Sequence, residues 1–344
     1  MTTRFASNQE ILDWNSHIIA NPDGGNMFAS YEFAVQKETG GYRSHFIFVD
    51  NLAITVLEKN TPFFGKLWYL PKGPGISSPN ELFNVLKSLE LFAKKHGVFA
   101  IRVESELISN QGPTLSRHGL IKSAPIIPNP STIVLNIGDN LEKVMTDLPQ
   151  KGRYAIKRAE RDGVKVKTVK STNKNCRQMY KLLSETAEGQ FGIRSYNYYK
   201  TFWQRFESAG LGQLFFAYFE DKIVAGAYAI VYGQKSTYKD GASVRKRTAY
   251  GASHLLQWHV IKWAKSHGSL IHDLCGSPPS NQINNPDHKH YGIGLFKTAF
   301  SKNVIDYIGC YDYVIDSTKY KIWINFLEKV AKRLHYYKHH DSYF

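Results

Sequence analysis

FAKKHGVFAIRVE, residues Phe92–Glu104, has a counterpart later in the chain in WAKSHGSLIHDLC, residues Trp263–Cys275. The two segments align without a gap at an offset of 171 residues (263 minus 92), and they share Ala, Lys, His and Gly. Each pattern is typical of a helix that ends at a His-Gly pair before a strand begins, because glycine readily adopts the left-handed conformation found at helix ends. The sequence thus predicts the same helix-to-strand junction at two places.

The similarity extends upstream of both junctions. Residues 65–97, GKLWYLPKGPGISSPNELFNVLKSLELFAKKHG, and residues 235–268, KSTYKDGASVRKRTAYGASHLLQWHVIKWAKSHG, each predict a strand, a loop and a helix. In both helices, apolar residues fall at i, i+4, i+7 and i+8, which is the spacing of one buried face. These residues are Val85, Leu89, Phe92 and Ala93 in the first copy, and Leu256, Val260, Trp263 and Ala264 in the second. Strands are expected to follow at Val98–Val103 and Ser269–Leu274, and this recurrence favours an internal duplication.

The repeat unit resembles the core of the acyl-CoA-type N-acetyltransferase fold. We therefore expect an α/β (α+β) protein with two tandem N-acetyltransferase-like (GNAT) domains, mixed sheets flanked by helices and no long helical-arm insertion. A length of 344 residues also favours two cores over one. Prolines at 125, 128 and 130 mark the boundary region, so the domains are predicted at 1–138 and 139–316. Residues 317–344 are expected to form a helix that packs back on the first domain.

The charge of the chain points to an anionic partner. A net charge of +15 fits nucleic acid, a phosphorylated substrate or an anionic membrane surface. Three scattered cysteines do not form a disulfide framework, and no window of the sequence has the length and hydropathy of a membrane span. We expect a cytoplasmic monomer, with peripheral contact to a membrane left open.

Four segments, in order, carry a resemblance to one family. They are YLPKGPG at 69–75, PSTIVLNIGDNLEKVMTDLPQKGRYAIKRAERDGVKV at 130–166, HDLCGSPP at 272–279 and YGIGLFKTAFSKNVIDYIGCYDYVID at 291–316. Together they resemble the FemABX family of aminoacyl-tRNA-dependent peptidyl transferases. The family's early F-x-Q-S-x-x-W pattern appears here as MFASYEFAVQK (27–37), without the Gln and the Trp of that pattern. The chain also departs from the family at Ser301, which replaces a glycine, and at Glu104, where Asp is common.

The resemblance implies an aminoacyltransferase of peptidoglycan cross-bridge synthesis. Such an enzyme transfers an amino acid from aminoacyl-tRNA to the stem-peptide side-chain amine of a precursor, UDP-MurNAc-pentapeptide or lipid II. Its partners are then aminoacyl-tRNA and a diphosphate-containing muropeptide, and it needs no further cofactor. Two alternatives are an acyl-CoA-dependent N-acyltransferase of the same fold and a non-enzymatic RNA-binding protein. The CoA alternative fits the loops less well, because Pro74 stands where a backbone amide is needed and Gly251 comes one residue late.

Lys297 is the predicted catalytic residue. Aminoacyl transfer from an ester passes through a tetrahedral oxyanion, and a desolvated cation stabilises such a charge strongly. Lys297 lies among apolar residues in GLFKTAF, at the family's Phe-Lys element, with Phe296 expected to point into the core. The alternative is a lysine that extends from a strand edge into solvent.

Six further residues are predicted to bind the acceptor. Lys37, Arg194, Tyr198 and Tyr238 are placed by the resemblance as ligands of its phosphates and sugar, in a cleft between the domains. Arg194 and Tyr198 are four residues apart and would share one face of a helix. Asp273 and Glu104 end equivalent strands of the two repeats, where either carboxylate would hold the acceptor ammonium or take a proton. For all six, the alternative is an ordinary surface role, such as a helix cap or an exposed ion pair.

The segment KGRYAIKRAERDGVKVKTVK (151–170) is the predicted tRNA contact. Arg153, Lys157 and Arg158 represent its basic residues, which would follow a phosphate backbone, although a solvated charged face has the same composition. No metal is expected. His272 and Cys275 are three apart in a predicted strand, so their side chains would face opposite ways.

Overall fold

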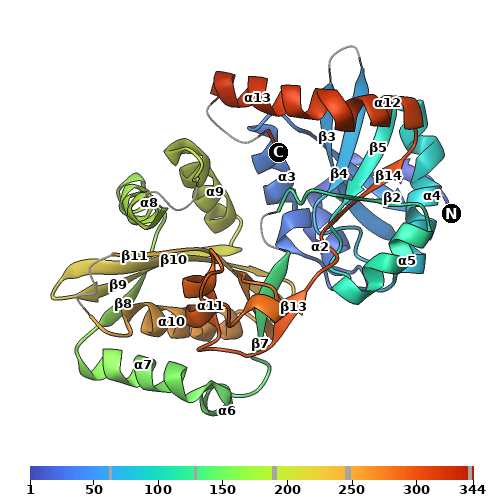
Figure 1. The fold of residues 1–344 in the computed structure, drawn as a ribbon. Helices are drawn as coiled ribbons and strands as arrows, with labels where there is room; N and C mark the ends of the chain where they lie inside the picture. Colours follow the sequence, from blue (N-terminus) through green and yellow to red (C-terminus); the bar gives the residue numbers. More distant parts are fainter. Residues whose placement is uncertain (62–63, 128–129, 188–191, 245–248, 340–342) are drawn as a thin grey trace. The chain divides into compact units, whose positions relative to one another are not determined.

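The computed structural model describes residues 1–61, 64–127, 130–187, 192–244, 249–339 and 343–344 (Figure 1). It divides into two compact units, which are considered separately. Unit 1 comprises Met1–Pro130 and Asp306–Phe344, and unit 2 comprises Ser131–Ile305.

Unit 1 contains a seven-stranded mixed sheet of order β1-β2-β3-β4-β5-β14-β6. Its strands are β1 Thr3–Phe5, β2 Arg43–Val49, β3 Leu52–Thr61, β4 Gly65–Leu70, β5 Val98–Val103, β6 Ile121–Ser123 and β14 Cys310–Val314. Its helices are α1 Asn8–Leu12, α2 Trp14–Ile19, α3 Tyr31–Glu38, α4 Pro79–Lys95, α5 Gly112–Arg117, α12 Ser317–Ile322 and α13 Glu328–His339. A π-helical turn, Trp323–Leu327, joins the last two helices. Neighbouring strands are antiparallel except β4 and β5, which are parallel and connected through α4.

Unit 2 has a second seven-stranded sheet of order β13-β7-β12-β11-β10-β9-β8. Its strands are β7 Ser131–Asn136, β8 Lys165–Val169, β9 Gly212–Phe219, β10 Lys222–Tyr232, β11 Lys235–Ser243, β12 Ile271–Gly276 and β13 Val304–Asp306. Its helices are α6 Leu141–Asp147, α7 Gln150–Arg161, α8 Asn173–Ala187, α9 Tyr196–Ser208, α10 Ala252–Ser266 and α11 Tyr291–Lys297. Figure 1 shows α8 and α9 on one face of this sheet and α10, backed by α7, on the other.

The predicted fold class is confirmed, and the repeat has the same structure in both units. β4, α4 and β5 correspond to β11, α10 and β12, and each helix connects two parallel strands. Gly97 and Gly268 follow the two helices with φ of +76° and +86°, the conformation predicted from the His-Gly pairs. The second strand of the later copy begins at Ile271, two residues after the predicted start. Among the described residues the longest uninterrupted α-helix is α4, with 17 residues.

The predicted domain limits, 1–138 and 139–316, need correction at both ends. β7 pairs with β12 and lies in unit 2, whereas β14 pairs with β5 and β6 and lies in unit 1. Each sheet therefore takes its sixth strand from a distant part of the chain: β14 lies between β5 and β6, and β7 between β12 and β13. Membership follows these hydrogen-bonded ladders, which local sequence pattern does not reveal. Of the boundary prolines, Pro128 lies outside the described residues.

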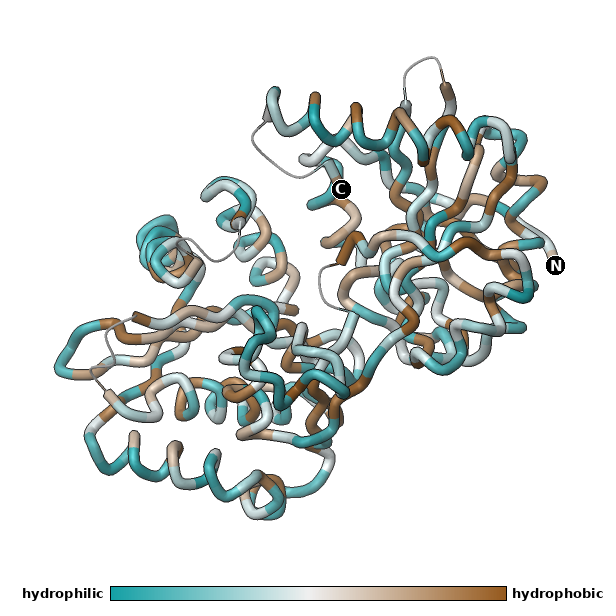
Figure 2. The backbone as a smooth tube through the Cα atoms, viewed as in Figure 1, coloured by the Kyte–Doolittle hydropathy of each residue, from teal (hydrophilic) through white to brown (hydrophobic). Residues whose placement is uncertain are grey.

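Each unit has its own hydrophobic core. In unit 1, Leu82, Leu86 and Leu89 of α4 pack with Ile101 and Val103 of β5. In unit 2, the buried face of α10 packs on β9 and β10 and includes the predicted residues Leu256, Val260 and Ala264. Figure 2 shows hydrophobic segments along the strands and helices of each unit.

Candidate functional site

Two neighbouring strands of unit 2 stop pairing partway along their length. The parallel ladder between β11 and β12 runs from Lys235 with Ile271 to Thr237 with Asp273 and ends there. In unit 1 the equivalent ladder continues to the ends of both strands, where Leu70 pairs with Val103. The two strands therefore do not pair with each other at their carboxyl ends, and ligands in open α/β folds bind beyond the carboxyl ends of the strands.

Both of these strands are also irregular at that point. The register of β11 against β10 shifts so that Lys239 is the extra residue between Tyr238 and Asp240. The register of β12 against β7 shifts between Asp273 and Gly276, and Cys275 has a φ of +60°. Bulges of this kind redirect side chains and frequently lie beside functional sites. The sequence does not signal either bulge.

Lys297 lies at the bulge in β12. It is the last residue of α11, its side chain is only 7% exposed, and Nζ donates hydrogen bonds to the carbonyl oxygens of Gly276 (2.7 Å) and Cys275 (3.1 Å). Burial lowers the pKa of Lys297, although Cys275 and Asp273 act in the opposite direction. The alternative of a lysine extending from a strand edge is wrong, because the residue is helical and buried. Phe296 packs on the core as expected, with its ring 5.1 Å from that of His254.

Asp273 holds the same bulge in shape. Its carboxylate accepts hydrogen bonds from the backbone N–H of Cys275 at 2.7 Å and from the hydroxyl of Thr132. Neither of these two contacts is that of a helix cap. The contacts assign Asp273 the role of fixing the carbonyl groups that receive Lys297.

Tyr238 reaches the same region from β11. Its ring lies 6.4 Å from Phe296, and burial, together with the nearby charges of Asp240 and Cys275, raises the pKa of its hydroxyl. A side chain at Gly241 would collide with the Tyr238 hydroxyl, so the glycine leaves space for the ring. The structure thus brings together three of the predicted residues: Lys297, Asp273 and Tyr238.

Arg194 and Tyr198 form a second group in unit 2. The helix α9 begins at Tyr196 after the Ser195 cap, so Arg194 precedes it, yet its guanidinium lies 4.7 Å from the centre of the Tyr198 ring. The predicted proximity is therefore correct, whereas the shared helix is not.

Sequence reasoning missed Lys239, which lies close to these two residues. Its Nζ is 3.1 Å from Asp240 Oδ1 and 5.1 Å from the centre of the Phe202 ring. Burial disfavours its charge, but Asp240 and the tyrosines 199 and 198 more than offset this and raise its pKa. Its position depends on the bulge beside Tyr238, which the sequence does not signal.

Lys37 and Glu104 lie in unit 1, and both are buried. Lys37 Nζ is 4.9 Å from the centre of the Tyr42 ring. Glu104 accepts hydrogen bonds from the Tyr69 hydroxyl and from the backbone N–H groups of Ile126 (2.8 Å) and Ile127 (3.2 Å). Burial raises the pKa of Glu104. An exposed ion pair is therefore wrong for Glu104, which ties the segment after β6 to the end of β5.

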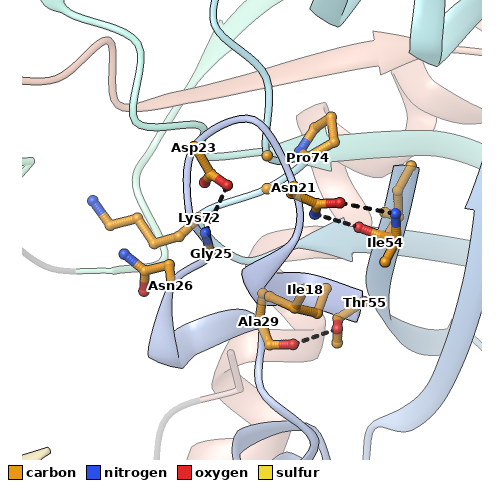
Figure 3. Close-up of a pocket in the computed structure, with 13 residues that line it drawn as sticks. Ile18, Asn21, Asp23, Gly25, Asn26, Ala29, Ile54, Thr55, Lys72 and Pro74 are labelled. Atoms are coloured by element: carbon orange, nitrogen blue, oxygen red, sulfur yellow. Dashed lines mark hydrogen bonds between the residues drawn. The ribbon is translucent and has the colours of Figure 1, made fainter. Parts of the chain in front are cut away.

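The YLPKGPG loop brings another lysine to Glu104. Lys72 has a φ of +50°, its Nζ is 4.3 Å from the centre of the Tyr307 ring, and it lines a small pocket with Glu104. It also lines the neighbouring pocket of unit 1 drawn in Figure 3, between the loop around Asp23 and the segment Lys72–Gly75. The sequence identified this loop as a motif without selecting its lysine.

The three predicted tRNA contacts lie on α7 in different surroundings. Arg153 donates to the carbonyl oxygens of Thr146 (2.8 Å) and Leu148 and thereby closes the end of α6. Arg158 pairs with Asp162 at 3.2 Å and lies 4.8 Å from the centre of the Tyr250 ring. Lys157 is exposed. Of the three, Lys157 has the surroundings that best fit a phosphate contact.

His272 is a core residue. Burial lowers its pKa to about 3, and its ring nitrogens lie 2.7 Å from Ser236 Oγ and 2.6 Å from Gln257 Nε2. In the part of the chain that the structure describes, no three His, Cys, Asp or Glu side chains are grouped to hold a metal ion. Within the same residues, no helix has the length and hydropathy to cross a membrane.

Gly152 of α7 packs closely against the backbone just after Lys297. A Cβ at this position of α7 would collide with the carbonyl oxygen of Ala299, two residues after Lys297. We expect Gly152→Ala to lower the free energy of unfolding by about 1–3 kcal/mol, as overpacking does, and to lower turnover as well. Urea unfolding and product formation measure the two effects. Gly163→Ala is the control for overpacking, since a Cβ there meets open space and only its φ of +88° is strained. A Gly152→Ala protein as active and as stable as the unmodified chain would contradict this close packing.

Comparison with known proteins identifies one family and related enzymes. Residues 127–220 and 213–329 match the FemAB family. The lipid II:glycine glycyltransferase of Staphylococcus saprophyticus is 32% identical over 111 residues, which are 32% of this chain and 26% of that protein. The protein of the same name from Staphylococcus aureus strain USA300 is 31% identical over 113 residues, 32% of this chain and 25% of that protein. The matches span about a quarter of the length of these relatives.

Two solved structures share the fold. The crystal structure of FemX superimposes with a TM-score of 0.80 at 18% identity, over 94% of this chain and 99% of that one. The structure of L-PGS from Bacillus licheniformis gives a TM-score of 0.54 at 12% identity, over 91% and 93%. At such identities the likeness concerns the fold alone.

Proposed function

The chain belongs to the FemAB family, and from this premise we propose that it transfers an amino acid from aminoacyl-tRNA to the side-chain amine of a peptidoglycan stem peptide. The relatives named lipid II:glycine glycyltransferase support this class of reaction. The acceptor is the diphosphate-linked muropeptide, carried either on a nucleotide or on a lipid. The proposal retains a cytoplasmic, monomeric enzyme that uses no cofactor besides its charged tRNA.

The observation that carries the proposal is the buried ammonium of Lys297 at the split between β11 and β12. An ammonium has three N–H donors, and two of those of Lys297 are directed to the carbonyl groups of Cys275 and Gly276. We assign the third to the oxyanion. Because the group is desolvated and held in place, its attraction for a developing negative charge is strong and needs little reorganisation.

The reaction then follows from positioning and charge. The acceptor amine attacks the ester carbonyl carbon, a C–N bond forms, and the carbonyl oxygen becomes the oxyanion that Lys297 stabilises. Collapse breaks the ester C–O bond, and the tRNA hydroxyl leaves with the proton that the amine loses. An ester is already activated, so no covalent enzyme intermediate is needed, and most of the acceleration comes from orientation and electrostatics.

The acceptor contacts extend this assignment. Arg194, Tyr198 and Tyr238 supply a cation and hydroxyl groups of the kind that bind a diphosphate and a sugar. Lys37 and Glu104 of unit 1, and Asp273 of unit 2, stay proposed ligands of the acceptor. Arg153, Lys157 and Arg158 mark the proposed tRNA side, with Lys157 as its clearest phosphate contact.

One experiment tests the function directly. Purified protein is incubated with fully charged total tRNA and either UDP-MurNAc-pentapeptide or lipid II, and the products are weighed by mass spectrometry. The expected result is a mass increment of an amino acid on one acceptor, abolished by RNase treatment. A parallel reaction with acyl-CoA donors tests the alternative donor. No increment on either acceptor with charged tRNA would refute the proposal.

Arg194→Ala is expected to weaken acceptor binding about tenfold, or about 1.4 kcal/mol, with kcat changed less than about threefold, because a charge-assisted contact made in ground and transition states is lost. KM for UDP-MurNAc-pentapeptide or lipid II, measured at saturating aminoacyl-tRNA, reports the effect. Arg177→Ala is a matched control, since Arg177 also lies over a tyrosine of α9, 5.4 Å from the centre of the Tyr196 ring. Equal rises in KM for both variants would assign Arg194 a structural role only.

A further inference from the structure

The helix formed by α12, the π-helical turn and α13 contacts unit 1 along one side. Tyr320 and Trp323 are buried, and Glu328 is buried through its ion pair with Arg102 at 3.2 Å. Trp323 and Glu328 are five residues apart, a spacing that a regular α-helix places on different faces. The π-helical turn Trp323–Leu327 widens the helix locally and lets both face inward. The inner side of this helix is therefore fixed.

The opposite side carries a row of exposed apolar residues. Phe326 is 68% exposed, Leu334 is 64% exposed and Tyr337 is 72% exposed. With Ile322 and Val330, which are also exposed, they recur every three or four residues, the spacing of one helix face. We call these five residues the outer face. Figure 2 shows hydrophobic residues recurring along this helix. A row of apolar side chains exposed to water indicates an interaction site.

Positive charge accompanies this row. Glu328 is the one acidic residue in the sequence between 317 and 339, and its carboxylate is buried. The basic residues of the same segment are Lys319, Lys321, Lys329, Lys332, Arg333 and Lys338. All six are exposed, and Lys332 among them pairs with Glu328 at 2.8 Å. Apolar side chains with cations beside them are the composition of a helix that lies in a membrane interface.

We propose that the outer face binds the surface of a bilayer that contains anionic phospholipid. The apolar side chains enter the boundary between headgroups and acyl chains, and the cations other than Lys332 pair with lipid phosphates. A nucleic acid would neutralise the cations but leave Phe326, Val330 and Leu334 in water. A second copy of this chain would cover the apolar row while bringing the same cations together. The proposal does not rest on the acyl-transfer function.

Vesicle co-sedimentation tests the binding. The full chain is mixed with vesicles of phosphatidylcholine alone, or with about 30% phosphatidylglycerol, which supplies the negative surface potential. We expect the protein to sediment with the anionic vesicles at least about fivefold more strongly than with the neutral ones, and added salt to reduce the difference. Hydrogen exchange should slow at residues 322–338 when anionic vesicles are added. Equal sedimentation with both kinds of vesicle would overturn the proposal.

Variants separate this surface from other causes. The double substitution Phe326→Ser and Leu334→Ser is expected to weaken vesicle binding about tenfold, and Lys329→Glu with Arg333→Glu to do the same. Leu12→Ser with Leu91→Ser is the matched control, since these residues of unit 1 are 79% and 71% exposed outside the outer face. Circular dichroism melting establishes that each variant is folded. Unchanged vesicle binding by Phe326→Ser with Leu334→Ser overturns the proposal. It is also overturned if the charge variant loses tRNA affinity but not vesicle affinity, or if the apolar variant merely abolishes a dimer.

Discussion

Replacing Lys297 with alanine is expected to lower kcat about 10²- to 10³-fold, the range found when one oxyanion donor is removed. KM for the acceptor should change by less than about threefold, because the interaction is made mainly in the transition state. The structure makes this residue suited to that role, since its ammonium is buried and directed by two backbone carbonyls. Product formation under saturating substrates gives kcat.

The controls for this prediction address folding and charge. Lys297→Met keeps much of the side-chain volume without the ammonium, and it should lose activity while unfolding near the same urea concentration. Lys302→Ala removes an exposed lysine five residues later and should have no effect. If Lys297→Met retains more than about a third of wild-type kcat, the electrostatic role is wrong.

The pH dependence provides a second test of Lys297. Burial lowers its pKa below the ordinary value of 10.5, so the ammonium is lost at a lower pH than that of an exposed lysine. If the protonated form is required, kcat falls as pH rises through this lowered pKa. The Lys297→Met enzyme has no such group, and its residual rate should lack that alkaline decline. An unchanged profile in the variant would assign the decline to another group.

Much of the fold was predictable because its signals are local. The apolar spacing of residues 85–93 and 256–264, with the His-Gly pairs that follow, specifies two helices and their ends, and both are observed. The assignment of β7 to the sheet of unit 2 and of β14 to the sheet of unit 1 was not predictable. The apolar pattern of each strand fits either sheet. The sheet that each strand joins is decided by pairing with a strand more than a hundred residues away in the sequence.

The candidate site was likewise predictable in its local features and not in its long-range ones. A lysine among apolar residues identified Lys297, but not the helix that carries it or the two carbonyl groups that it meets. Those groups depend on a bulge held by Asp273 and Thr132, which are 141 residues apart in sequence. Lys239 was missed for the same reason, since its significance comes from the register shift against β10. Spacing reports which residues share a face of one element, whereas a bulge depends on the partner strand.

Removing the guanidinium of Arg102 is expected to destabilise the protein by about 3–5 kcal/mol, because it leaves a buried carboxylate without its partner. Arg102 and Asp312 are almost fully buried, and two hydrogen bonds of 2.7 and 2.9 Å join them. A further contact of 3.2 Å reaches Glu328 of α13. Urea unfolding of Arg102→Ala measures the loss, and Asp147→Ala, which breaks the exposed pair with Lys143, should cost less than about 1 kcal/mol.

The pH dependence of this network follows from Glu328. Burial alone would raise its pKa, but Arg102 and Lys332 more than offset this, and the pKa is lowered from 4.5. The network therefore stabilises the fold fully above the unfolded value, and the stabilisation is lost as pH falls through the lowered pKa. Arg102→Ala removes the main cause of the lowering, so the unfolding free energy of that variant should depend less on pH below about 5. An identical pH dependence in both proteins would contradict this assignment.

The double substitution Arg102→Met with Asp312→Leu tests whether the ion pair stabilises the fold or fixes the position of α13 on unit 1. Replacing both partners with apolar side chains removes the desolvation cost as well as the attraction, so the double variant should recover most of the stability that Arg102→Ala loses. Glu328 is then left without its inward cation, and the inner side of α13 has lost its polar attachment to β5. If the ion pair specifies how α13 lies on unit 1, hydrogen exchange of residues 328–338 should be faster in the double variant although global stability is restored. If exchange is unchanged, Trp323 and the packing around it suffice to hold the helix.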